Sequence, residues 1–246
     1  MKLKILVGSI VFFMVAAACG VNVNLDNNAL TGSGKRVTET REVSGFDEVV
    51  LAGSGELYIE QGDEETLTVE ADDNIIDYVK SEVNGDTLEL GFKDNFSISL
   101  SKPVVFRLTV RDITSVTLAG SGKVESGALE TDKLTVNLPG SGEMTFDQVD
   151  TTRLHVTIAG SGDVTVLDGA ADSEEINMLG SGNFEAGAFQ VKEASATIAG
   201  SGNITVRASD TLTAKILGSG NIRYYGNPAA INMDTAGSGN IEKIGD

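Results

Sequence analysis

The chain has 246 residues, a formal net charge of −18 and a single cysteine. So acidic a chain is not expected to bind nucleic acid or anionic lipid through a broad positive surface, which needs clustered Lys and Arg. One cysteine excludes a disulfide within the chain. The charge is typical of a soluble, exposed protein.

The first 18 residues predict a signal peptide. They begin Met-Lys-Leu-Lys and continue with an apolar run from 5 to 18, too short for a comfortable membrane span. Cys19 follows three alanines, which resembles the lipobox of bacterial lipoproteins, although Ala16 stands where Leu is usual. The resemblance implies cleavage before Cys19, its lipidation and membrane attachment through that lipid. The expected location is therefore the cell envelope, as an outer-membrane lipoprotein; the alternative is an ordinary signal peptide.

Residues 19–36 are rich in Asn and short polar residues, and they predict a tether that includes Gly32-Ser33-Gly34. Residues 37–246 are expected to form one domain with a less regular first half. Between the Gly-Ser-Gly copies at 53 and 120, the pattern predicts a strand, a short helix capped by Asn74, a turn, a second strand, a loop insertion and a third strand, at 66–69, 74–80, 84–86, 87–90, 94–101 and 104–110.

The tripeptide Gly-Ser-Gly occurs nine times, and its last five spacings are 20, 20, 20, 18 and 19 residues. A fixed period in this range is typical of a solenoid. Apolar residues stand four and two positions before most copies and four after them, with polar residues between, as in a strand with one buried face. Each repeat is therefore predicted to be a strand, a corner, a second strand and a variable turn. The corner glycines are Gly53, Gly55, Gly120, Gly122, Gly140, Gly142, Gly160, Gly162, Gly180, Gly182, Gly200, Gly202, Gly218, Gly220, Gly237 and Gly239.

The predicted fold class is all-β, a single-stranded parallel β-helix with rungs of about 20 residues. Hairpins at the tripeptides would instead give an antiparallel meander, but only a parallel coil needs equivalent positions every 20 residues. We expect the glycines to supply positive φ at the corners. The corner serines are predicted to form a hydroxyl ladder, and Asn183, Asn203, Asn221 and Asn240 an amide ladder. About ten rungs would give a rod roughly 45–50 Å long.

Few residues suggest chemistry. The one histidine, His155, falls in an outward-facing column, where a lone histidine is usually solvated. The acidic runs 63–65, 72–73 and 172–175 are candidates for calcium, but none has EF-hand spacing. Tyr224-Tyr225 is the one aromatic pair outside the signal peptide, with Tyr224 predicted buried and Tyr225 exposed. We therefore assign no catalytic residue, no metal ligand and no cofactor.

The sequence Gly-Ser-Gly-Asn-Ile at 200–204, 218–222 and 237–241 and the segments 41–49 and 57–62 resemble the family called putative auto-transporter adhesin, head GIN domain. The resemblance covers residues 37–246. It implies a right-handed, single-chain β-helix on an exported bacterial protein, often a lipoprotein, and it brings no catalytic residue.

The function expected from these observations is that of a non-enzymatic, lipid-anchored envelope solenoid. It would act as an adhesin or surface-binding scaffold for a protein or polysaccharide. One alternative is a carbohydrate-active β-helix enzyme that uses surface carboxylates. Another is an envelope factor that self-associates through the strand edge at its C-terminal end, unless the charged tail blunts that edge.

Overall fold

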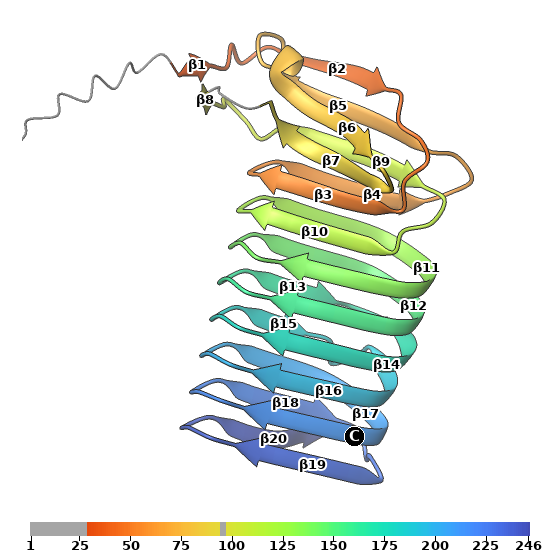
Figure 1. The fold of residues 1–246 in the computed structure, drawn as a ribbon, viewed down its shortest axis with the longest axis vertical. Coiled ribbons are helices and arrows are strands. Elements are labelled where there is room, and N and C mark those ends of the chain that lie inside the picture. The colour runs from red at the N-terminus through yellow and green to blue at the C-terminus, as the bar shows by residue number, and fades with distance from the viewer. Residues whose placement is uncertain (1–28, 94–96) are drawn as a thin grey trace, which may run out of the picture.

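The computed structural model describes residues 29–93 and 97–246, and these form a right-handed, single-stranded parallel β-solenoid with a differently built N-terminal end (Figure 1). Cys19 and the predicted signal peptide lie outside the described residues. Across the described ranges, the structure contains no helix of the length and apolarity that a membrane crossing requires.

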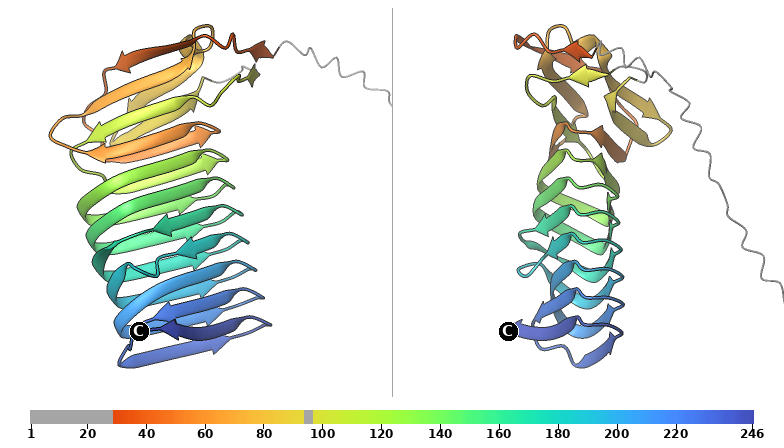
Figure 2. Two further views of the ribbon diagram at one scale, coloured as in Figure 1. Left: turned by 180° about the vertical axis from the view of Figure 1, so that it is seen from behind. Right: turned by 90° about the vertical axis from the view of Figure 1, so that its left-hand side faces the viewer.

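Each rung is flattened. One strand runs to a Gly-Ser-Gly corner, and a second strand returns to a bend on the opposite side, so two parallel sheets face each other across a thin core (Figures 1 and 2). We call the two narrow sides the corner edge and the bend edge. The bend edge comprises residues 127–133, 147–153, 167–173, 187–193, 207–211 and 226–229.

The rungs are built from parallel strands in register. Three long strands bend around the bend edge and contribute to both sheets: β11 (Lys123–Leu138), β12 (Glu143–Ile158) and β17 (Asn203–Ile216). The others are β3 (Glu48–Gly53), β4 (Glu56–Gln61), β10 (Ser115–Gly120), β13 (Asp163–Val166), β14 (Gly169–Met178), β15 (Asn183–Glu185), β16 (Gln190–Ile198), β18 (Asn221–Tyr225), β19 (Ala230–Thr235) and β20 (Asn240–Gly245).

The predicted apolar columns form the core. Residues one period apart stack on each other, as Val136, Val156, Ile176 and Ala196 do. Burial of these columns against their neighbours stabilises a rung that could not hide its apolar face alone. In β19, by contrast, Ile231 and Met233 continue buried columns yet are about half exposed, at 46% and 47%.

The corner glycines have a different role from the one we expected. Only Gly53 and Gly237 of this set have positive φ, at 102° and 146°. From Gly120 onward the corner glycines are required by close stacking, because a Cβ on Gly160 would overlap the carbonyl oxygen of Gly140 directly beside it, and the other corners of these rungs repeat this arrangement. Gly55, in the first corner, instead lies close to the Phe106 side chain. The expectation of positive φ was therefore wrong for most corners.

The ladder along the corner edge is formed by backbone groups. The amide N–H of Ser141 donates to the Gly120 carbonyl at 2.9 Å, and each later corner repeats this bond. No hydrogen bond joins two corner serine hydroxyls anywhere in the described chain, so the expected hydroxyl ladder was wrong. The amide ladder is confirmed for three of its four predicted members: Asn203 Nδ2 donates to Asn183 Oδ1 at 2.9 Å, and Asn221 Nδ2 donates to Asn203 Oδ1 at 3.0 Å. It was wrong for Asn240, whose side-chain amide donates to Glu242 at 3.3 Å while only its backbone N–H reaches Asn221 Oδ1.

The first half of the domain forms a cap. Antiparallel strands β2 (Arg36–Arg41), β5 (Thr66–Asp72) and β9 (Val105–Val110) join the hairpin β6 (Val79–Asn84) and β7 (Thr87–Phe92) through the 3-10 helix η1 (Ile76–Tyr78). Strands β7 and β9 pair in parallel with β3 and β4 and so cover the first rung. We call this unit the N-terminal cap.

The cap changes several expectations. The three predicted strands and the turn at Gly85, whose φ is 61°, are confirmed. Asn74 does not cap the helix; its side chain instead bonds the backbone of Thr31 and Ser33. Because residues 62–113 build the cap and not further rungs, eight corners stack, not ten, and their seven steps span about 34 Å.

Part of the predicted tether is also ordered. Strand β1 (Leu30–Thr31) pairs with β8 (Ile98–Ser99), and the Ser33 hydroxyl donates to Asp73 at 2.6 Å. The first Gly-Ser-Gly copy is thus fixed against the cap and does not join the stacked corners. Residues 30–36 belong to the folded domain.

Candidate functional site

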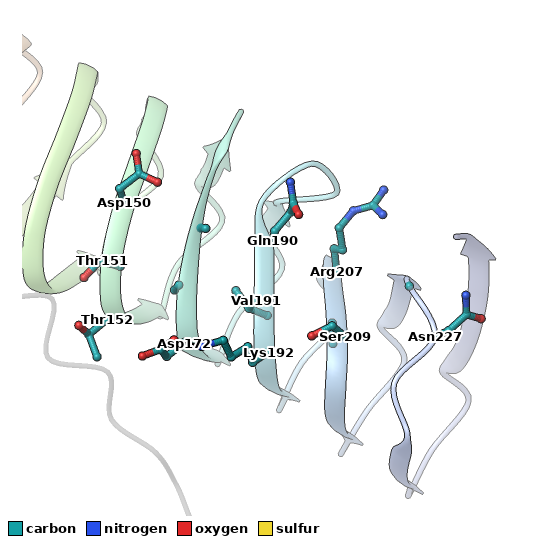
Figure 3. A pocket seen from close by; sticks show the side chains of 14 residues that line it. Asp150, Thr151, Thr152, Asp172, Gln190, Val191, Lys192, Arg207, Ser209 and Asn227 are labelled. Carbon is teal, nitrogen blue, oxygen red and sulfur yellow. Dashed lines mark hydrogen bonds and ion pairs between the residues drawn. The ribbon is translucent and has the colours of Figure 1, made fainter.

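A groove runs along the bend edge, parallel to the rod axis. It consists of three hollows of about 380, 680 and 730 Å³. The first two share Gln61, Arg111, Glu130 and Asp150, and the second and third share Asp150, Thr151 and Thr152, so they form one continuous depression. We call it the bend-edge groove, and Figure 3 shows its largest part.

The groove exists because one column of the coil carries small side chains. Successive rungs place there Thr131, Thr151, Ala171, Val191, Ala208 and Gly226. Ala171, Val191 and Ala208 are buried and form an apolar floor. Thr131 continues this floor with an exposed fraction of 9%, and its Oγ1 has no hydrogen-bond partner.

The walls of the groove are polar. Asp150, Gln190 and Arg207 lie along one side of the floor (Figure 3). Thr152, Asp172, Lys192 and Ser209 lie along the other. Lys192 Nζ contacts Asp172 Oδ1 at 2.6 Å, and this hydrogen bond raises the pKa of the lysine.

The end of the groove nearest β20 is held by a connected set of polar contacts. Arg207 stacks on Tyr225 with 4.9 Å from its Cζ to the ring centroid, and its Nε donates to the Gly187 carbonyl at 2.9 Å. Lys243 Nζ donates to Asn227 Oδ1 at 2.7 Å and to Asp246 at 2.5 Å. The bond from Lys243 lowers the pKa of Asp246.

The other end is fixed to the N-terminal cap through Gln61. Its Nε2 donates to the carbonyls of Arg111 and Glu130, at 3.0 and 2.9 Å, and its Oε1 accepts the Glu130 N–H at 2.7 Å. One side chain therefore ties β4, β11 and the segment after β9 together. Both ends of the groove are preorganised, because they are fixed by bonds within the protein.

The electrostatics of the groove are acidic. Six carboxylates line it, against three cationic side chains, which gives a formal charge of −3. The carboxylates belong to Asp63, Asp112, Glu130, Asp132, Asp150 and Asp172, and the cations to Arg111, Lys192 and Arg207.

The carboxylates of the acidic runs 63–65, 72–73 and 172–175 do not gather into one site; each has a different environment. Asp72 is buried and accepts the Ser101 hydroxyl, Asp73 binds Ser33 and Lys35, and Glu65 accepts the Gly45 N–H. Asp172 lines the groove, whereas Glu174 lies in the core. In the parts of the chain that the structure describes, no three His, Cys, Asp or Glu side chains gather as they would around a metal ion.

The remaining predicted positions are as follows. His155 is on the outer face with 31% of its side chain exposed, and it contacts Glu175 at 3.4 Å, away from the groove. Tyr224 is buried and Tyr225 is partly exposed, as predicted.

The groove itself was not predicted from the sequence. Its signal is the run of small residues at 131, 151, 171, 191, 208 and 226, which is visible only once the register is known.

The described residues thus form a flattened parallel β-solenoid with a groove along one narrow side. The chain belongs to the family described as putative auto-transporter adhesin, head GIN domain, whose model matches residues 45–228. The resemblance seen in the sequence is thereby confirmed.

Solved structures of other proteins share this fold. A putative adhesin from Bacteroides fragilis is 27% identical, with 88% of this chain and 100% of that chain covered and a TM-score of 0.83. A putative lipid binding protein from Parabacteroides distasonis is 26% identical, with 88% and 99% covered and a TM-score of 0.73. A putative adhesin from the same organism, 24% identical over 88% and 100%, shares the fold with a TM-score of 0.73. No curated protein sequence matches the chain.

Proposed function

We propose that this protein is a non-enzymatic, lipid-anchored binding module of the cell envelope that holds its ligand in the bend-edge groove. The observation that carries the proposal is the groove itself: three hollows along the bend edge that share lining residues and whose two ends are fixed by bonds within the protein. Membership of an adhesin-named family supports a role in surface contact. The lipid-binding name of one structural neighbour is not adopted for the groove, since the walls of the groove are polar and charged.

The anchoring part of the proposal rests on Cys19. If Cys19 is acylated, the mature N-terminal peptide gains the mass of its lipid, and the chain fractionates with membranes. Cys19→Ser is expected to release the folded protein into the soluble fraction. Membrane association unchanged by Cys19→Ser, or an unmodified mature cysteine in mass spectrometry, would contradict it.

The binding part is tested with two matched variants. Ala170 is exposed and lines the groove, whereas Ala159 is exposed on the corner edge. The mature chain, residues 19–246 with Cys19→Ser, is screened against envelope proteins and polysaccharides. Ala170→Arg should weaken any saturable binding about tenfold or more by filling the groove, and Ala159→Arg should leave it within about twofold.

The same screen addresses the enzyme alternative. Polysaccharide samples are assayed for new reducing ends after incubation with the protein. Their release would overturn the non-enzymatic assignment, and equal binding by both arginine variants would exclude the groove as the site.

A further inference from the structure

The bend-edge groove also indicates the kind of ligand it takes, an inference that rests on the proposed function of that groove. We infer that it binds one uncharged polysaccharide chain, lying lengthwise along the rod.

The backbone around the groove excludes the commonest way of binding an extended peptide. Strands β12, β14, β16 and β17 cross under the groove and are paired with neighbours on both sides. Apart from the bend positions Thr152, Asp172 and Lys192, which the strand registers skip, their hydrogen-bonding groups are used by the parallel ladder, and no free strand edge lies along the groove. A peptide could not add itself as a further strand there, so the ligand must be held by side chains.

The side chains match sugar hydroxyls. A hydroxyl both donates and accepts, and the walls offer carboxylate acceptors, amides and hydroxyls on both sides of one floor. Within the described structure, the side chains of Gln190 and Thr152 have no hydrogen-bond partner, although both face the groove (Figure 3). The buried Oγ1 of Thr131 also lacks a partner, at the floor of the second hollow. A buried polar atom of this kind is costly unless something pairs with it.

The floor matches the other surface of a sugar ring. Ala171, Val191 and Ala208 underlie the polar walls as an apolar floor, with exposed fractions of 7%, 4% and 1%. The exposed methyl group of Ala170 stands between Asp150 and Gln190 in one wall. A pyranose ring has the same division, with C–H groups on its faces and hydroxyls at its rim. No Trp occurs in the chain, so each sugar would be held without a large stacking platform. Affinity must therefore come from several adjacent subsites.

Charge selects among polysaccharides. The groove has a formal charge of −3 on a protein of −18, so an acidic polysaccharide or an anionic lipid headgroup would be repelled. This sum already includes Lys192, which is paired with Asp172 and so is not free to bind an anion. An uncharged chain meets no such penalty.

The geometry sets the expected length of the ligand. The floor from Thr131 to Gly226 spans five rung steps, or about 24 Å. One sugar of an extended chain spans roughly one such step, so the floor accommodates on the order of five sugars.

The test uses the mature chain with Cys19→Ser and isothermal titration calorimetry. The probes are linear neutral oligosaccharides of increasing length from the gluco-, manno- and xylo-series, an oligogalacturonate series as the anionic arm and a lysine-rich peptide as the cationic arm. For at least one neutral series, affinity should rise with length and level off near five sugars. Ala170→Arg should reduce it about tenfold or more, the double variant Thr152→Ala, Gln190→Ala should reduce it about fivefold, and Ala159→Arg should leave it unchanged.

The outcomes separate this inference from the proposed function. Failure of every neutral series, or binding of only the anionic or cationic probe, overturns the inference. If a different envelope ligand then binds and Ala170→Arg abolishes that binding, the groove remains a binding site and the proposed function stands. Neutral binding that Ala170→Arg leaves intact, with an unchanged thermal midpoint for the variant, overturns both.

Discussion

At the scale of single residues, Glu174 conflicts most clearly with its surroundings. It occupies a core column that holds Leu134, Leu154, Ala194 and Leu212 in the neighbouring rungs, with 2% of its surface exposed and neither carboxyl oxygen hydrogen-bonded. Burial raises its pKa from 4.5 to about 8. At neutral pH this carboxyl is therefore protonated in the folded protein and ionised in the unfolded chain.

The pH dependence of stability follows from that difference. The folded state binds the extra proton between pH 4.5 and about 8, so the free energy of unfolding falls as the pH rises through this interval and levels off above it. The loss is on the order of a few kcal/mol. Glu174→Gln should remove most of this slope, and Glu174→Leu should also raise the thermal midpoint at pH 8. Urea unfolding between pH 5 and pH 8 measures the slope, and thermal unfolding at pH 8 measures the midpoint.

A matched control lies on the outer face of the next rung. Glu193 is exposed, so Glu193→Gln should leave the pH profile nearly unchanged. If wild type and Glu174→Gln lose stability equally as the pH rises, Glu174 is not the titrating group.

A second residue-scale prediction concerns the corners. Gly160→Ala places a methyl group against the Gly140 carbonyl, and the two rungs must separate to accommodate it. We expect the free energy of unfolding to fall by more than about 2 kcal/mol. The neighbouring Ser161→Ala should change it by less than about 0.5 kcal/mol, because the Ser161 side chain is exposed. Equal effects in chemical denaturation would refute the stacking argument.

At the scale of elements, the N-terminal cap depends on Arg36. Its guanidinium contacts Glu70 Oε1 at 3.0 Å and the carbonyls of Glu70 and Pro103 at 2.9 and 3.0 Å. It also lies 3.9 Å from the buried carboxyl of Asp72. One side chain thus joins β2, β5 and the segment before β9.

Removing that side chain should loosen the cap. Arg36→Ala leaves Asp72 buried without its cation, and we expect a loss of about 3 kcal/mol. Hydrogen exchange should show faster exchange in β2, β5 and β9 than in β14 and β16. Arg223→Ala, which breaks an exposed pair with Glu242, is the control and should cost less than about 1 kcal/mol. Uniform loss of protection along the whole rod would argue against a separate role for the cap.

The elements also show how far the sequence leads. Period-2 columns and a 20-residue spacing were enough to predict the coil, its buried columns and the amide ladder of Asn183, Asn203 and Asn221, because these follow from local alternation and repetition. The cap could not be recognised, since the pairing of Arg36–Arg41 with Thr66–Asp72 is antiparallel and joins segments with no repeat between them. The stacking role of Gly160 was also missed, because it depends on the distance between rungs and not on local φ.

The candidate site was harder to foresee than the fold. Asp172 and Glu174 stand two residues apart in one acidic run, yet one lines the groove and the other enters the core. The local sequence at the bend does not indicate which of the two side chains points outward and which points into the core. The size of Ala171, Val191 and Ala208 matters only after the register has placed them in one column.

At the scale of the whole molecule, the solenoid should behave as a stack of replaceable units. Deleting residues 140–159 removes one period and brings Gly160 directly beneath Gly120. The columns stay in register, so the shortened protein should fold cooperatively and lose only the contribution of one rung. Deleting residues 140–149 removes half a period and brings unlike positions together. Circular dichroism and thermal unfolding should find the first variant folded and the second not; similar behaviour of both would contradict the model.

The division between inward and outward columns determines which positions of this protein can be substituted without disturbing the fold. The walls of the bend-edge groove are formed by side chains such as Gln190, Ser209 and Thr152, which are not part of the buried columns that hold the rungs together. Under the proposed function, replacing them would alter what the groove binds while the stacking remains intact. The groove walls can therefore vary by surface substitution alone, and sequence identities of 27% and 26% accompany TM-scores of 0.83 and 0.73 in two structures that share this framework.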